Sequence, residues 1–585
     1  MPEYLAPGVY VEETSFRAKS IEGVGTSTTA FVGPTRKGPH RANDNDLQTP
    51  ELLTSYGDFE RIYGGYADLN VTAGVPATNY LAHAVLAFFN EGGSRLYVSR
   101  VRSAGASAAE APVVGDGPNN ERISFVARFA GSGGNGRVTV REIVAPASPV
   151  TMSSAPQGSL LRTGAGGAVA HHVKIGETWR PAANTDDPAA DAATLAEANP
   201  RLLTLQLTAS DADDNVLAWD ALGHDRRHPR WIGHVLSENP TRRADALQNW
   251  LAIRIGEAVS AIDLRDGLFN GGAANPQGQL ERTRVLTGGD DGGEPTEAEY
   301  RLALGAIAAL EDVSIVAAPG SSAYTNAASP VMRALISHAE ARRAYRIAVL
   351  DTPPGQIPGN VRTLRGTVDS RHAALYYPWV VVANPNARPG REDIPREIAL
   401  PPSGYVCGIY ARNDVQRGVH KAPANEVVRS ALRFEVDVNF GQQELLNPMG
   451  VNCLRLLSGR GYRVWGARLI SSDPEWKYVS DRRYFNYLES SIDRGTQWAV
   501  FEPNGERLWA NVRQTIADFL YNEWQNGALL GTTTDEAFFV RCDRSTMTQN
   551  DLDNGRLICL IGVAILKPAE FVIFRIGQKT AETAS

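Results

Sequence analysis

The chain has 585 residues, 43% hydrophobic and 21% charged, a composition typical of a globular protein with about three or four domains. Its formal net charge of −7 provides no general basic field that would attract nucleic acid. No run approaches the roughly 18 apolar residues of a membrane-spanning helix, and the acidic N-terminus is unlike a signal peptide.

The N-terminal part combines short strands with one strong helix. Residues 9–11 and 24–33 are rich in β-branched and aromatic side chains or threonine, which predicts strands. Residues 77–90 place apolar side chains at spacings of three and four and are followed by a glycine pair, which predicts a helix that ends there. A further strand is expected at 95–101.

The middle of the chain changes character twice. Residues 103–293 are rich in glycine, alanine, proline and aspartate with short alternating runs, which predicts a β-rich insertion. After it, helical patterns alternate with short apolar runs at 314–318, 346–351 and 373–382. This alternation predicts βαβ units and a parallel sheet covered on both faces. The chain segments before and after the insertion are expected to pack together.

The last third predicts an α+β domain. Residues 505–525 have the apolar spacing of one amphipathic helix, and strand-like runs follow at 537–543 and 556–567. A third apolar run, 571–576, lies close to the end of the chain. Such a strand needs a sheet to join, and the sequence leaves open whether that sheet belongs to the same subunit.

An α/β sheet raises the question of catalysis. Predicted strand ends and loops carry Ser321, Asp351 and His372, but no G-x-S-x-G turn prepares a serine nucleophile. A capping aspartate and a loop histidine explain the same residues, so a hydrolase is a remote alternative. The glycines of 131–136 lead into a strand, which predicts a β-turn. The acidic run 211–215 lacks the spacing of a calcium loop, which predicts a solvated turn.

Metal and ligand sites have equally weak support. His171 and His172 are adjacent and would point to opposite faces of a strand. The four cysteines form no CxxC pair, which favours buried thiols of a reducing compartment. A β-rich adhesin or carbohydrate-binding module at 103–293 stays open, although its tryptophans follow no repeat.

Arginines lie near the ends of the predicted C-terminal elements. They are Arg482, Arg483, Arg494, Arg541 and Arg544. Each alone is an ordinary surface residue. As a group they suit an acidic protein partner, because complementary charge sets register and association rate.

Several motifs, taken in order, resemble the contractile tail sheath proteins of bacteriophages and phage-tail-like particles. They are PGVYVEE at 7–13, TAFVG at 29–33, GP at 38–39, NEGGSRLYVSRV at 90–101, PPSGYVCGIYARNDVQRGVHKAPANE at 401–426, NPMGVNCLR at 447–455 and RGYRVWGARLISSD at 460–473. The resemblance covers about 1–102 and 296–580. The ordered set is specific, whereas each motif alone is not.

The resemblance implies a structural subunit that stacks as hexameric rings around an inner tube and contracts to drive the tube through a target envelope. It implies no catalysis and no cofactor, because the energy is stored in the lattice. The implied partners are further copies of the chain, an inner tube protein, and baseplate and terminator or cap proteins, with neither nucleic acid nor membrane insertion. Assembly in the bacterial cytoplasm is implied, followed by presence in a phage or phage-tail-like particle.

Strand exchange is the implied link between subunits, because terminal arms of family members add strands to a neighbour's sheet. The donor residues would be Val9, Tyr10, Val11, Phe571, Val572, Ile573 and Phe574. The acceptor residues would be Phe538, Phe539, Val540, Leu557, Ile558, Leu560 and Val563, with linkers at 14–25 and 567–568. Tube-facing candidates are Arg482, Arg483, Arg494, Arg513, Arg541 and Arg544. The alternative, pairing of both terminal strands within their own subunit, stays open.

The expected fold class is α/β and α+β multidomain. The expected domains are an arm at 1–25, a core part at 26–102, a β-rich outer domain at 103–293, an α/β middle domain at 294–420, an α+β tube-facing domain at 421–567 and an arm at 568–585. The resemblance implies a subtilisin-like fold for the middle domain.

Overall fold

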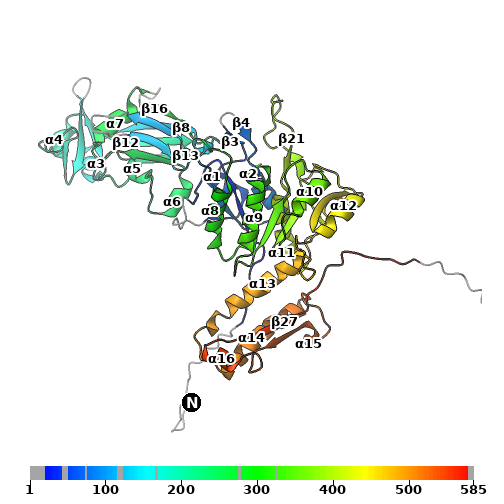
Figure 1. Ribbon diagram of the computed structural model, residues 1–585. Helices are drawn as coiled ribbons and strands as arrows, with labels where there is room; N and C mark the ends of the chain where they lie inside the picture. Colours follow the sequence, from blue (N-terminus) through cyan, green and yellow to red (C-terminus); the bar gives the residue numbers. More distant parts are fainter. Residues whose placement is uncertain are drawn as a thin grey trace, which may run out of the picture. The chain divides into compact units, whose positions relative to one another are not determined.

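The structure is a computed structural model that describes residues 20–41, 50–72, 75–114, 123–164, 169–274, 279–324 and 326–576. The described chain forms two compact units. The core unit contains residues of 27–412 and 424–471, and the C-terminal unit contains 20–26, 413–423 and 472–576. Figure 1 shows the chain coloured by sequence.

A nine-stranded sheet organises the core unit, in the order β2-β5-β1-β17-β18-β19-β24-β25-β22. The bounds are β1 (Thr29–Pro34), β2 (Leu52–Leu53), β5 (Leu96–Val101), β17 (Ile315–Ala317), β18 (Ile347–Asp351), β19 (Ala373–Tyr377), β22 (Glu426–Val427), β24 (Val451–Leu457) and β25 (Gly461–Val464). All strands from β5 to β24 in this order run parallel. The parallel α/β sheet is confirmed, and strands from both sides of the insertion share it.

Helices cover both faces of this sheet. They include α1 (Tyr56–Tyr63), α2 (Tyr80–Glu91), α8 (Glu297–Ala308), α9 (Ala328–Ala339), α10 (Pro358–Arg365), α11 (Pro402–Arg417) and α12 (Phe440–Leu446). On one face Ile307 of α8 and Val331 of α9 are buried in one cluster with Val316 of the sheet. On the other, the rings of Phe31 and Phe88 lie 5.7 Å apart. The apolar strands follow from this two-sided burial.

The predicted helix at 77–90 is α2, and its ends explain its length. The Asn79 side chain accepts a hydrogen bond from the Ala82 amide at the N-terminus. At the C-terminus Gly92 has a φ of 112°, a left-handed conformation that glycine adopts without strain. Smaller sheets complete this unit: β3 (Leu69–Thr72) with β4 (Val75–Ala77), and β20 (Val380–Ala383) between β21 (Glu397–Leu400) and β23 (Arg433–Phe434).

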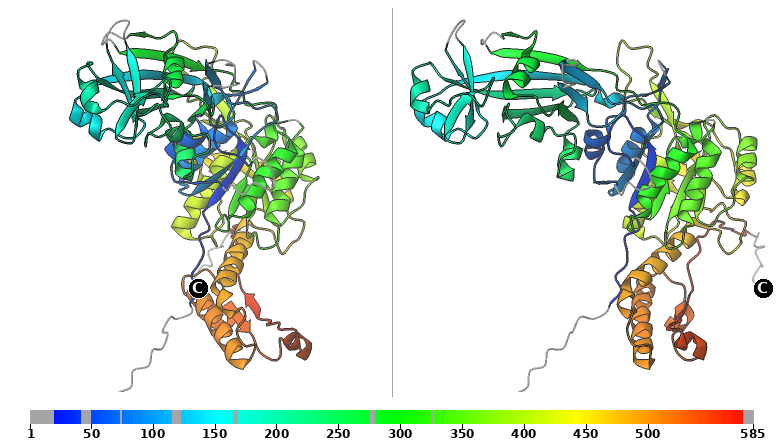
Figure 2. Two further views of the ribbon diagram at one scale, coloured as in Figure 1. Left: turned by 90° about the vertical axis from the view of Figure 1, so that its left-hand side faces the viewer. Right: turned by 60° about the vertical axis from the view of Figure 1, so that its left-hand side comes forward.

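The insertion is β-rich, as predicted, and its strands form layers of their own (Figure 2). An eight-stranded sheet contains β8 (Gly136–Pro146), β9 (Leu160–Thr163), β10 (Ala170–Ile175), β11 (Thr178–Pro181), β12 (Arg201–Ser210), β13 (Val216–Leu222), β15 (Ala273–Ala274) and β16 (Leu280–Leu286). A three-stranded sheet contains β6 (Glu110–Val114), β7 (Ile123–Ala127) and β14 (Leu251–Ile255). The short helices are α3 (Pro149–Ser154), α4 (Ala192–Ala196), α5 (Ile232–Val235), α6 (Arg243–Gln248) and α7 (Ala261–Phe269). Both sheets contribute to one buried cluster around Phe125 and Leu207.

The C-terminal unit is built on two long helices and a two-stranded antiparallel sheet. This sheet, β26 with β27, is called the C-terminal hairpin below. The elements are α13 (Val479–Gly495), α14 (Glu506–Gln525), α15 (Thr534–Ala537), β26 (Phe538–Arg541), α16 (Gln549–Asp553) and β27 (Leu560–Val563). α14 confirms the predicted helix, and Leu508, Val512 and Ile516 lie in its buried stripe. These residues pack with Tyr484 and Leu488 of α13 in one cluster.

Three sequence expectations differ from the structure. Residues 424–471, expected in the C-terminal domain, belong to the core unit because β24 pairs with β19 of its sheet. The run 571–576 is not assigned to a strand, and the predicted strand runs 537–543 and 556–567 shorten to β26 and β27. Leu557 and Ile558 therefore precede β27, and Val9, Tyr10 and Val11 lie outside the described residues.

Across the described ranges, none of the helices combines the length and apolar character required to cross a membrane.

Candidate functional site

The three residues of the hydrolase alternative do not meet. Asp351 ends β18, whereas His372 precedes β19, and these parallel strands pair Ala348 with Ala373. His372 and Asp351 therefore lie at opposite ends of these two strands, roughly 13 Å apart along the strand direction. Asp351 accepts hydrogen bonds from the Ser403 amide at 2.7 Å and hydroxyl at 2.5 Å.

Asp351 thus holds the start of α11. Burial raises the pKa of Asp351 to about 7, and the two hydrogen bonds from Ser403 oppose this rise. A carboxylate beside a helix N-terminus is favourably placed relative to the helix dipole. The geometry is that of a structural cap for α11.

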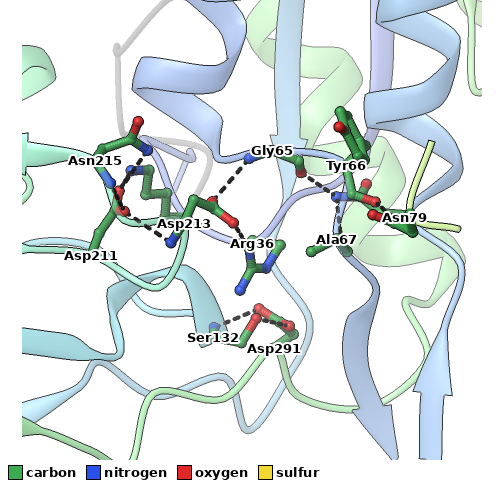
Figure 3. Close-up of polar contacts among 12 residues, drawn as sticks. Arg36, Gly65, Tyr66, Ala67, Asn79, Ser132, Asp211, Asp213, Asn215 and Asp291 are labelled. Carbon is green, nitrogen blue, oxygen red and sulfur yellow. Dashed lines mark hydrogen bonds and ion pairs between the residues drawn. The ribbon is translucent and has the colours of Figure 1, made fainter. Parts of the chain in front are cut away.

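The acidic run 211–215 binds two cations of the chain itself (Figure 3). Lys37 pairs with Asp211, and Arg36 pairs with Asp213. Asp213 also accepts the Gly65 amide at 3.0 Å. The turn between β12 and β13 therefore fastens the insertion to the segments that follow β1 and α1.

The glycine-rich turn at 131–134 reaches the same place. The Gly133 amide donates to the Arg36 carbonyl at 2.9 Å, and a Cβ at Gly131 would lie 2.1 Å from that oxygen. The Ser132 amide and hydroxyl donate to Asp291 at 2.8 and 2.6 Å (Figure 3). The glycines thus permit a close approach to the segment that contains Arg36. The turn connects the insertion to the core and is not a phosphate-binding loop.

Metal-binding clusters of three or more His, Cys, Asp or Glu are absent from the described residues. His171 and His172 lie on β10, and His172 Nε2 is 3.2 Å from the Thr163 hydroxyl.

The C-terminal hairpin is an incomplete sheet. β26 and β27 form a two-stranded antiparallel sheet, an isolated bridge joins Leu529 to Ile565 just beyond β27, and no third described strand runs alongside the pair. Phe538 and Val540 pack on the core of the unit. On the opposite face Phe539 and Leu560 are 50% and 51% exposed. A two-stranded sheet is marginally stable alone, and its edges offer unpaired backbone groups to another strand.

The apolar run after Glu570 is exposed. Phe571, Val572, Ile573, Phe574 and Ile576 have exposed fractions of 68%, 68%, 80%, 83% and 97%. This run is called the C-terminal arm below and comprises Phe571–Ile576. Pairing of the arm within its own subunit, the open alternative, is absent from the described structure.

Arg482 and Arg483 are not surface residues. Their exposed fractions are 4% and 3%, and Arg483 donates to both oxygens of Asp414 at 2.8 and 2.6 Å. The Thr26 hydroxyl donates to the same carboxylate at 2.6 Å. These two arginines therefore stabilise the C-terminal unit and are removed from the tube-facing candidates, because a buried ion pair is not accessible to a partner.

The other four candidate arginines are exposed. Arg513 of α14 donates to the Cys542 carbonyl at 3.4 Å, and Arg541 and Arg544 flank Cys542 and Asp543 in sequence. The Arg544 guanidinium lies 5.4 Å from the ring of Trp509. Three of the candidates thus gather beside the end of β26, whereas Arg494 lies near the end of α13.

Part of the expected N-terminal linker is packed against α13. Ile21 is buried in the cluster of the C-terminal unit, and the Val24 amide donates to the Ser491 hydroxyl at 3.1 Å. A Cβ at Gly23 would lie 2.2 Å from the Tyr487 hydroxyl. Sequence reasoning missed this packing. The signal that could have indicated it is the apolar Ile21 close to Gly23, a pattern typical of a segment packed closely on another element.

Two family models match adjoining parts of the chain. Residues 293–468 match the phage tail sheath protein central domain, and residues 471–579 match the phage tail sheath C-terminal domain. A putative prophage major tail sheath protein of Pseudomonas aeruginosa (strain UCBPP-PA14) is 26% identical over 268 residues, 45% of this chain. That match spans 64% of the length of the Pseudomonas protein.

Two solved sheaths share the fold. The contracted PVC sheath complex of an extracellular contractile injection system is similar over 99% of both chains, with a TM-score of 0.52 and 19% identity. The contracted helical sheath of the anti-feeding prophage is similar over 98% of this chain and 100% of its own, with a TM-score of 0.52 and 21% identity. Residues 293–468 and 471–579 therefore carry the central and C-terminal domains of phage tail sheath proteins, and the solved sheaths share the fold of the chain.

Proposed function

We propose that this protein is the structural subunit of a contractile sheath. Copies stack as hexameric rings around an inner tube, and contraction drives the tube through a target envelope. The partners are further copies of the chain, the inner tube protein, and baseplate and terminator or cap proteins. Assembly takes place in the bacterial cytoplasm and yields a phage tail or a phage-tail-like particle. We also propose that the middle domain has the subtilisin-like fold that the family resemblance implies.

One observation carries the proposal: the chain has both an exposed apolar segment and a sheet of only two strands. The C-terminal arm is apolar and exposed, and the β26–β27 hairpin has unpaired edges. Main-chain hydrogen bonds between them would link two subunits through any change in their packing. The acceptor set therefore narrows to Phe538, Phe539, Val540, Leu560 and Val563, within β26 and β27.

The alternation of side chains supports this pairing. In an extended strand Phe571 and Ile573 share one face, and Val572, Phe574 and Ile576 share the other. The hairpin has the matching composition, with Phe538 and Val540 on the core face and Phe539 on the outer face. A donated arm would place one apolar face on the core and the other beside Phe539 and Leu560, where same-face neighbours stabilise each other.

The inner tube would be contacted by the exposed arginines of the C-terminal unit. Arg513, Arg541 and Arg544 lie around residues 542–543, and Arg494 is the fourth candidate. Their charge suits an acidic surface on the tube, for which long-range attraction sets the association rate and register.

Removing residues 1–15 tests the N-terminal half of the exchange. The packed residues 20–26 remain, so we expect a folded subunit with unchanged thermal unfolding. We expect only monomers or small oligomers by sedimentation and no long tubes by electron microscopy, because the donor residues Val9, Tyr10 and Val11 are gone. Normal tubes from this variant would exclude the N-terminal donor strand.

A further inference from the structure

The base of the C-terminal arm is held by polar contacts to the start of α13. The Tyr478 hydroxyl donates to Glu570 Oε2 at 2.9 Å, and Lys477 Nζ lies 3.7 Å from the same oxygen. The Glu570 amide donates to the Pro568 carbonyl at 3.0 Å, which closes a tight turn. Lys477, Tyr478 and Glu570 are called the clasp below.

The charge of Lys567, three residues before Glu570, also acts on the first turn of α13. Asp481 is buried in the first turn of α13, and burial raises its pKa to about 6 while the Lys567 ammonium opposes the rise. Two residues of 567–570 therefore interact with the start of α13: Lys567 through its charge on Asp481, and Glu570 through the clasp. The clasp thus fixes Glu570 at the start of α13 before any partner binds.

Burial of the chain ends at the clasp. The Glu570 side chain is 19% exposed, whereas Phe571, the next residue, is 68% exposed. The sequence predicted a linker at 567–568, and those residues precede Glu570 in the chain. The pivot of the arm is therefore the Glu570–Phe571 junction.

We propose that Glu570 is the positioning residue of the C-terminal donor strand. By binding Tyr478 and Lys477 it fixes where the arm leaves α13, so that only Phe571 onward is ordered during donation. Fewer residues lose conformational freedom on assembly, and association becomes more favourable. The inference rests on the proposed strand donation and adds the residue that directs it.

Loss of the clasp should raise the threshold for assembly, defined as the protein concentration at which tubes form. Sedimentation of the full chain measures this threshold. For Glu570→Ala and Tyr478→Phe we expect unchanged thermal unfolding and a rise in this threshold of about tenfold, comparable to one lost hydrogen bond to a charged group. Hydrogen exchange of residues 567–570 in the unassembled subunit should become faster. The matched control is Glu502→Ala, an exposed glutamate of the same unit.

Exchanging the charges of Lys477 and Glu570 distinguishes a positioning role of Glu570 from a general loss of structure. Glu570→Lys should raise the threshold, and Lys477→Glu combined with Glu570→Lys should restore it in part. A wild-type or lower threshold for Glu570→Ala would overturn the clasp, since a lower value would mean that the contact restrains the arm. Truncation after Glu570 tests donation itself: normal tubes would exclude the donated arm whatever the Glu570 variants do.

Discussion

Changing Ile573 and Phe574 together to aspartate should abolish tube formation and leave the subunit folded. Both side chains are exposed in the free subunit, at 80% and 83%, so their replacement should change the free energy of unfolding by less than about 0.5 kcal/mol. In a donated strand they lie on opposite faces. Each would lose about 1.5–3 kcal/mol of apolar burial and would place a carboxylate against an apolar surface.

The measurement compares thermal unfolding with negative-stain electron microscopy of the same preparation. Val285→Asp is the matched control, because Val285 is an exposed strand valine at 62% in β16 of the insertion. The control should form tubes at the wild-type concentration. If the double variant also forms tubes, the arm is not the donor; if it unfolds at a lower temperature, the arm has contacts within its own subunit.

Local patterns predicted the elements that local interactions determine. The helix expected at 505–525 is α14 at Glu506–Gln525, because its apolar spacing alone specifies a buried stripe. The parallel sheet followed from short apolar runs between helices, which only two-sided burial explains. The boundary at 420/421 was misplaced because the pairing of β24 with β19 joins segments more than 70 residues apart, and no local pattern encodes such a partner.

Charged residues were the least predictable part of the candidate site. Arg482 and Arg483 follow the start of α13, where a surface position is the usual expectation for arginine. Arg483 is buried because Asp414, 69 residues earlier, supplies a carboxylate. The acidic run 211–215 is a turn, as predicted, but it is not solvated: Asp211 is buried, because Arg36 and Lys37, over 170 residues away in sequence, pair with the run. Composition shows that a charge exists, and only the fold shows what neutralises it.

The joint between insertion and core should be sensitive to the loss of its buried ion pair. Asp211 and Lys37 have side-chain exposures of 0% and 3%, and Asp211 also accepts the amides of Asp213 and Asn215 at 2.9 Å. Asp211→Ala leaves a buried ammonium and several unpaired donors. We expect a loss of about 3–5 kcal/mol in the free energy of unfolding, measured by urea titration and by proteolysis of the insertion.

The neighbouring residues provide graded controls for this joint. Lys37→Met leaves the carboxylate with its donors from the turn, so a smaller loss of about 1–3 kcal/mol is expected. Asp214→Asn, in the same turn, removes an exposed pair with Arg137 and keeps a side chain that tolerates the φ of 59° at this position, so it should cost about 0–1 kcal/mol. A loss below about 1 kcal/mol for Asp211→Ala would show that the buried pair does not hold the insertion. Equal losses for Asp211→Ala and Asp214→Asn would instead assign the effect to the turn as a whole.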